Sequence, residues 1–97
     1  MALVNEATYR YSNIASATTT VVKTTPGQLR RIIINKPVIS TTITIYDNTA
    51  ASGTKIATIT NPGTLLDAQI QLEYGVNFTI GLTIVTSGAD DITVVYL

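Results

Sequence analysis

Short runs of alternating apolar and polar residues are separated along this chain by turn-forming residues. The clearest run is 41–47, in which Ile43 and Ile45 alternate with Thr42 and Thr44. A period of two is the pattern of a β-strand with one buried face. Further strand-like runs cover residues 7–14, 18–24, 28–35, 54–60, 76–86 and 91–97.

Glycine and proline set the boundaries of several runs. Pro26-Gly27, Lys36-Pro37 and Asn61-Pro62-Gly63 are turn signals, and Ser87-Gly88-Ala89-Asp90 leads into the last run. The runs 41–47 and 54–60 are predicted to pair as a hairpin. Gly81 interrupts the run 76–86 and predicts a bulge or a close backbone approach. Alternation along that run places these residues on one face: Val76, Phe78, Ile80, Leu82 and Ile84.

Two segments carry a weaker pattern. Residues 64–74 alternate like a strand, yet Thr64 and Asp67 have the spacing of a helix capping box, and Gly75 is a possible helix end. Because the neighbouring runs are all strand-like, we expect a strand for at least the second half. Residues 1–8 are predicted to be an N-terminal arm, and residues 9–97 to form the folded domain.

The composition favours the same fold class. Thr, Ile, Val, Tyr and Phe, which suit a pleated surface, make up 45 of the 97 residues. This length allows one domain. We therefore expect an all-β, single-domain antiparallel β-sandwich, jelly-roll-like, with about eight strands.

Charge and rare residues limit the chemistry. Six Lys and Arg balance six Asp and Glu, so the net charge is zero, and Cys, His and Trp are absent. This disfavours a disulfide framework, a thiolate or imidazole metal site and a Ser-His or Cys-His nucleophile. We expect no enzyme, no cofactor and no bound metal. The N-terminal sequence lacks the features of a signal peptide, and no apolar run is long enough to span a bilayer, so we expect a soluble, cytoplasmically made protein without a membrane partner.

The charged residues have simple structural interpretations. Asp90 and Asp91 are adjacent, and neighbours on an extended chain point to opposite faces, so we expect a turn residue followed by a strand start. Asp47-Asn48 is interpreted as a turn. Arg30-Arg31 raises the possibility of nucleic-acid binding, but acidic residues later in the chain cancel the charge. Rim charges between neighbouring subunits or sheets are the preferred interpretation, and we expect no nucleic-acid partner.

Alternation places Ile32 and Ile34, Ile84, and Ile92, Val94 and Tyr96 on the core side of their runs. Four apolar residues then fall on faces turned away from the expected core. They form the candidate subunit interface: Ile33, Val85, Val95 and Leu97. Val85, Val95 and Leu97 lie on consecutive strands joined by a short turn and are predicted to share one patch. The alternative is that the N-terminal segment covers this face.

Several motifs resemble those of a group of short bacteriophage proteins. The resemblance extends over roughly residues 26–97, and Tyr9 to Val22 fit more loosely. Its motifs are Pro26-Gly27-x-Leu29, Ile32-x-Ile34-Asn35, Thr42 to Asn48, Ser52 to Ile59, Gly81 to Gly88 and Asp91 to Tyr96.

This resemblance implies a small structural component of a tailed-phage virion and transfers no catalytic residue. Among virion roles we expect a capsid decoration or cement protein, located on the capsid surface, that forms a homotrimer and binds the major capsid protein. The alternatives are a tail, fibre or head-tail connector module, or a module that binds a host receptor or carbohydrate.

Overall fold

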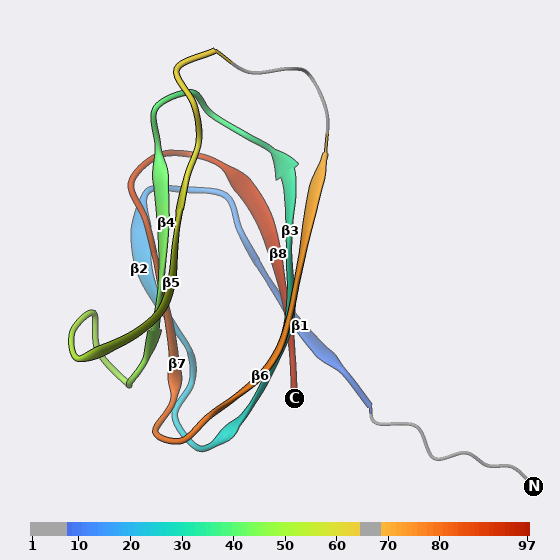
Figure 1. Ribbon diagram of the computed structural model, residues 1–97, viewed down its shortest axis with the longest axis vertical. Coiled ribbons are helices and arrows are strands. Elements are labelled where there is room, and N and C mark those ends of the chain that lie inside the picture. The colour runs from blue at the N-terminus through green and yellow to red at the C-terminus, as the bar shows by residue number, and fades with distance from the viewer. Residues whose placement is uncertain (1–7, 65–68) are drawn as a thin grey trace, which may run out of the picture.

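The computed structural model describes residues 8–64 and 69–97. Within them the chain forms eight strands: β1 (Arg10–Ile14), β2 (Thr18–Lys23), β3 (Gly27–Lys36), β4 (Thr42–Asp47), β5 (Thr54–Thr60), β6 (Ile70–Phe78), β7 (Leu82–Thr86) and β8 (Asp91–Tyr96). The strands form two antiparallel four-stranded sheets that lie face to face (Figure 1). The expected all-β sandwich is confirmed.

The strand order is that of a jelly roll. Sheet A has the order β1-β8-β3-β6, and sheet B has the order β2-β7-β4-β5. The pairs are nested in the sequence, because β4 pairs with β5, β3 with β6, β2 with β7 and β1 with β8. The chain is thus one long hairpin wrapped into two sheets, which is the jelly-roll arrangement of eight strands.

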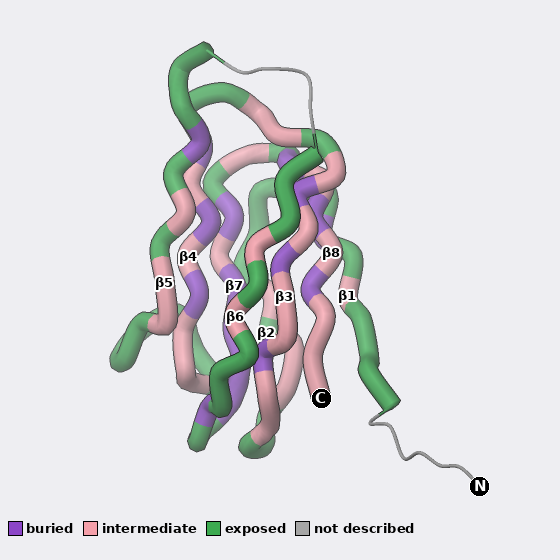
Figure 2. Tube along the Cα trace, turned by 45° about the vertical axis from the view of Figure 1, so that its right-hand side comes forward, coloured by how far each residue is buried: buried purple, intermediate pink, exposed green. Residues whose placement is uncertain are grey.

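The core lies between the two sheets. The inward positions of the alternating runs are almost fully buried and appear in Figure 2 as repeated buried segments along the strands. These residues are Ile14, Leu29, Ile32, Ile34, Ile43, Ile45, Phe78, Leu82, Ile84, Ile92 and Val94. The predicted inward positions of β3, β4 and β8 are confirmed, because a strand with one buried face places every second side chain in the core.

The run 76–86 is two strands rather than one. β6 ends at Phe78 in sheet A and β7 begins at Leu82 in sheet B, so the chain changes sheet between them. Ile80 is 53% exposed in the connecting turn, so the prediction that it shares one face with Phe78, Leu82 and Ile84 was wrong. The close approach predicted at Gly81 is confirmed, since a Cβ atom there would lie 2.8 Å from the carbonyl oxygen of Lys23.

Two predictions fall partly outside the described residues. The predicted arm, residues 1–8, is described only at Thr8, which is exposed. Of the segment 64–74, residues 65–68 are not described, so the capping box between Thr64 and Asp67 stays a prediction. Residues 70–74 belong to β6, and the strand predicted for the second half is confirmed.

Candidate interaction surface

The structure separates the four candidate interface residues into two groups. Ile33, Val95 and Leu97 lie on the outer face of sheet A, whereas Val85 lies on the outer face of sheet B. Consecutive strands β7 and β8 belong to different sheets, so the prediction of one patch containing Val85, Val95 and Leu97 was wrong. All four are partly exposed. Their role in a subunit contact stays a prediction.

Sheet A brings two tyrosines to the same face as the first group. Tyr11 lies directly opposite Val95, and alternation along the chain puts Tyr9 on this face as well. Tyr9 is 43% exposed and Tyr11 is 75% exposed. We call the five residues Tyr9, Tyr11, Ile33, Val95 and Leu97 the sheet A patch. An exposed group of large apolar side chains on one face is typical of an interaction site.

A row of side chains crosses the whole width of sheet A through this patch. Tyr11 is opposite Val95, Val95 is opposite Arg31, and Arg31 is opposite Glu73 on β6. The Nε of Arg31 donates to both carboxylate oxygens of Glu73, at 3.0 and 2.9 Å. This hydrogen bonding lowers the pKa of the Glu73 carboxyl and raises the pKa of Arg31.

Arg30 contacts Tyr9 of the sheet A patch. Its guanidinium lies 5.9 Å from the centre of the Tyr9 ring, which is within the range of a cation–π contact. Arg30 occupies an irregular position, since the register shifts between Leu29 and Arg31 against both neighbouring strands. Its Nε is buried without a hydrogen-bond partner among the described residues. Both arginines thus contact residues of their own sheet, and the predicted rim charges between neighbouring subunits or sheets stay a prediction.

A polar network borders the patch near the start of β8. Asn13 donates from Nδ2 to Oδ1 of Asp91 at 2.7 Å and to the carbonyl of Ile92 at 2.9 Å. Asn35 donates to the same Asp91 oxygen at 3.2 Å and to the hydroxyl of Thr93 at 2.9 Å. Three strands are thus joined by side chains on the outer face, and this part of the surface is hydrophilic.

The loops at the opposite end of the sandwich from the C-terminus (Figure 1, top) are joined by a buried carboxylate. Asp90 is fully buried and accepts hydrogen bonds from the backbone N–H of Val38, the hydroxyl of Thr41 and the amide of Asn61. These groups belong to the β3–β4, β5–β6 and β7–β8 connections. The predicted turn role of Asp90 is confirmed. Its burial was not predicted, because no local pattern distinguishes Asp90 from Asp91.

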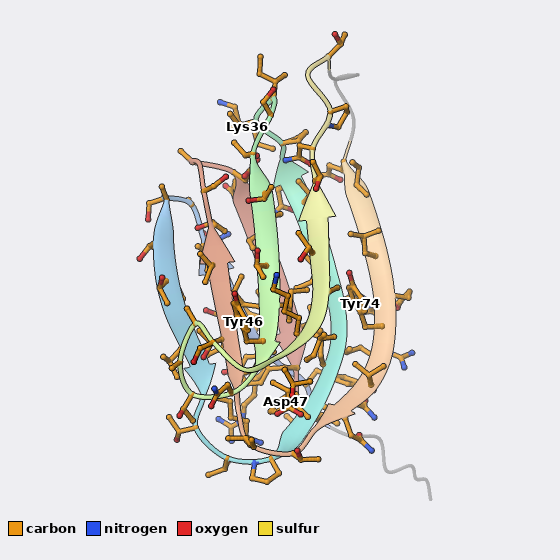
Figure 3. The ribbon with its side chains drawn as sticks, turned by 60° about the vertical axis from the view of Figure 1, so that its left-hand side comes forward. Lys36, Tyr46, Asp47 and Tyr74 are labelled. Carbon is orange, nitrogen blue, oxygen red and sulfur yellow. The ribbon has the colours of Figure 1, made fainter. Side chains whose placement is uncertain are left out.

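A second carboxylate organises the other end. Asp47, labelled in Figure 3, ends β4 and accepts hydrogen bonds from the backbone N–H groups of Thr79, Ile80 and Gly81 in the β6–β7 turn. The bond from the Thr79 N–H is the largest of the effects that lower the pKa of the Asp47 carboxyl. This contact holds the turn that takes the chain from sheet A to sheet B.

The outer face of sheet B has a different character. Thr19 and Thr44 flank Val85 on the neighbouring strands, and Thr58 lies opposite Thr44 on β5. Threonine keeps the stiffness of a β-branched residue while presenting a hydroxyl to water. Val85 is therefore flanked by hydroxyl groups, and the same face also carries Val21, which is 45% exposed, and Tyr46, both opposite Thr83.

The chain has no match among protein-family models, curated proteins or solved structures. Within residues 8–64 and 69–97, no group of three or more acidic residues could hold a metal ion. Helices long and apolar enough to cross a membrane are likewise absent from this described part. The jelly-roll fold and the sheet A patch are therefore the features on which a functional proposal rests.

Proposed function

We propose that the chain is a structural protein of a tailed-bacteriophage virion, and that it decorates and stabilises the assembled capsid as a homotrimer. The observation that carries the proposal is the sheet A patch, in which Tyr9, Tyr11 and Val95 form an exposed apolar surface on a rigid sheet. Such a surface suits contacts with other protein subunits. The major capsid protein is the proposed partner.

The architecture supports this role. Jelly rolls are a recurrent building block of viral capsids, although lectin domains share the fold. Carboxylates at both ends of the sandwich, Asp90 and Asp47, fix the connections between strands. A stiff module loses little conformational entropy on docking, and a trimer multiplies a weak contact with the shell through multivalency.

A trimer suits the geometry of an icosahedral shell. Such a lattice offers sites of local three-fold symmetry, so three identical patches meet three identical partners. A subunit contact of ordinary size buries about 800 Å² per partner. The monomer has 5341 Å² of accessible surface, which is ample for both a subunit contact and a shell contact.

Co-sedimentation with undecorated capsids tests the proposal. The purified chain is expected to bind at a fixed stoichiometry and to raise the melting temperature of the capsids. Val95→Asp places a charge in the middle of the sheet A patch and is expected to weaken binding strongly, because it splits the trimer on which multivalent attachment depends. Val85→Asp, on the other sheet, is the matched control and is expected to bind normally. Failure of the unmodified chain to bind capsids would contradict decoration and favour a tail, fibre or connector module.

A receptor- or carbohydrate-binding module is the second candidate. The observation that favours it is the highly exposed Tyr11 beside the amide-rich network of Asn13 and Asn35, since sugars stack on aromatic rings and hydrogen-bond to amides. A glycan array probed with the purified chain tests this function. Specific binding that Tyr11→Ala removes would support it, and an empty array would count against it.

A further inference from the structure

The two sheets differ in how their open edges are built. Within residues 8–64 and 69–97, sheet A ends in β1 and β6 and sheet B ends in β2 and β5, and these four strands have one strand neighbour each. An edge strand presents unpaired backbone N–H and C=O groups, which can pair with another chain. Natural proteins block this pairing with lysine, proline, bulges or very short strands.

Both edges of sheet B carry such protection. β2 ends in Lys23 and β5 contains Lys55, while neither strand contains an acidic residue. The register of β2 shifts between Val21 and Lys23, and a shift also interrupts the pairing of β5 with β4. Two positively charged, irregular edges repel each other and match an incoming strand poorly.

The edges of sheet A are protected less, by a bulge at Tyr74 and Gly75 in β6 and by the five-residue length of β1. β1 and β6 contain neither lysine nor proline, and their single charged residues have opposite signs, Arg10 on β1 and Glu73 on β6. Exposed apolar side chains also gather on these strands, with Tyr11 at 75% and Ile70 and Val76 at 37%. Arg10 lies opposite the inward-facing Tyr96 and Glu73 lies opposite the outward-facing Arg31, so the two charges point to different faces and do not repel each other across a β1–β6 pair. Exposed apolar surface on both edges favours their association.

The backbone of both strands is regular where a partner would pair. β1 pairs with β8 without a register shift over all five residues. β6 is regular from Ile70 to Glu73, and its bulge is confined to Tyr74 and Gly75, where Gly75 has a positive φ of 61°. β6 thus offers a regular edge of four residues for pairing with another strand, and β1 offers a regular edge of five residues.

We propose that copies of the chain join edge to edge through sheet A, with β1 of one copy paired against β6 of the next. β1 and β3 run in the same direction and β6 runs opposite, because each neighbouring pair in the sheet is antiparallel. A neighbouring copy in the same orientation therefore presents its β1 antiparallel to β6, and the sheet continues across the contact. The tyrosines of β1 and Val95 on β8 lie beside this junction.

The charges favour this head-to-tail contact over a two-fold one. Pairing β1 with a second β1 would bring two Arg10 side chains into one contact, and pairing β6 with β6 would do the same for Glu73. A contact between different edges generates a closed ring when its rotation closes. Closure at three copies rests on the proposed function, whereas the pairing of β1 with β6 does not.

Complementation between two edge variants tests the contact. Tyr11→Lys adds a charge to the β1 edge, and Ile70→Lys adds one to the β6 edge. Each variant alone is expected to have the mass of one chain in analytical ultracentrifugation, with an unchanged β-type circular dichroism spectrum. Mixed together, they are expected to form a dimer of one copy of each, because every variant keeps the edge that the other has lost. Val21→Lys, on the β2 edge of sheet B, is the control and is expected to keep the mass of the unmodified protein.

The other outcomes overturn the proposal in distinguishable ways. A loss of association in Tyr11→Lys but not in Ile70→Lys would show two-fold pairing of β1. A mixture that stays monomeric, or variants that keep the full mass, would show that these edges are not the contact. If the unmodified chain is a monomer yet binds capsids, the edge contact is wrong and the decoration function stands.

Discussion

Asn61 and Asp90, which are 29 residues apart in the chain, are joined inside the protein. The amide of Asn61 donates to Oδ1 of Asp90 at 2.9 Å, and both side chains are buried. Thr41 completes the cluster, since its hydroxyl donates to Asp90 at 2.8 Å and also accepts a hydrogen bond from Asn61. Asp90 therefore fixes loops that the strand ladders alone leave unconnected.

Asp90→Asn is expected to destabilise the fold by about 2–3 kcal/mol. The substitution replaces a carboxylate oxygen, which accepts hydrogen bonds, by an NH2 group that faces other hydrogen-bond donors, so buried donors lose their acceptor. The midpoint of thermal unfolding is expected to fall by roughly 10 °C or more for a domain of this size. Asp91→Asn is the matched control, because Asp91 is partly exposed on the outer face, and its effect is expected to stay below about 1 kcal/mol. Equal effects of the two variants would contradict the structural role of Asp90.

Gly81→Ala is expected to cost about 1–3 kcal/mol, since the added methyl group would overpack a closed turn. Its Cβ would lie 2.8 Å from the carbonyl oxygen of Lys23 and 3.1 Å from that of Asn48, and backbone atoms move at high cost. Gly63→Ala is the control, because its nearest neighbour is the Ser40 hydroxyl at 3.6 Å. Urea unfolding of both variants measures the difference, and a neutral Gly81→Ala would disprove the close approach.

Acid is expected to weaken the contact between Asp47 and the β6–β7 turn. Its hydrogen bonds hold the pKa of the Asp47 carboxyl below its ordinary value of 3.8. A lowered folded-state pKa means that the carboxylate stabilises the fold fully above the unfolded-state pKa, and that this stability is lost as the pH falls through the folded-state pKa. Asp47→Asn is therefore expected to cost about 1 kcal/mol at pH 6, a figure kept small because the group is partly exposed.

Equilibrium unfolding at pH 6 and at pH 2.5 measures this effect. The difference between the unmodified protein and Asp47→Asn is expected to be smaller at the lower pH, because protonation of the carboxyl removes the charge that the amide also lacks. A difference that is the same at both pH values would show that the charge of Asp47 has no part in holding the turn.

Alternation in the sequence was sufficient to predict strands and their inward residues, because that pattern depends only on which side chains enter the core. Ile43 and Ile45 on β4 and Ile92 and Val94 on β8 are examples. The same pattern does not say to which sheet a strand belongs. Local alternation therefore predicts one patch for Val85 and Val95, although the β7–β8 connection crosses from sheet B to sheet A.

The residues that position the connections were not predictable, since they act over long sequence separations. The turn that divides β6 from β7 is held by Asp47, which lies 32 residues before Thr79. Tyr11 lies in the sheet A patch because β1 pairs with β8, the last strand of the chain, which places Tyr11 opposite Val95. Such pairings follow from the nested strand pairs of the jelly roll, and short local motifs in the sequence do not predict them.

Val95 and Val85 offer a matched test of which sheet meets a neighbouring copy. Both are partly exposed valines on outer faces, yet Val95 lies between Tyr11 and Arg31, whereas Val85 lies between Thr19 and Thr44. Val95→Asp is expected to reduce the mass in light scattering from that of three chains to that of one, because a desolvated carboxylate beside an apolar ring is costly. Val85→Asp is expected to keep the full mass. Circular dichroism should show intact β-structure in both, and loss of the oligomer in Val85→Asp alone would place the subunit contact on sheet B.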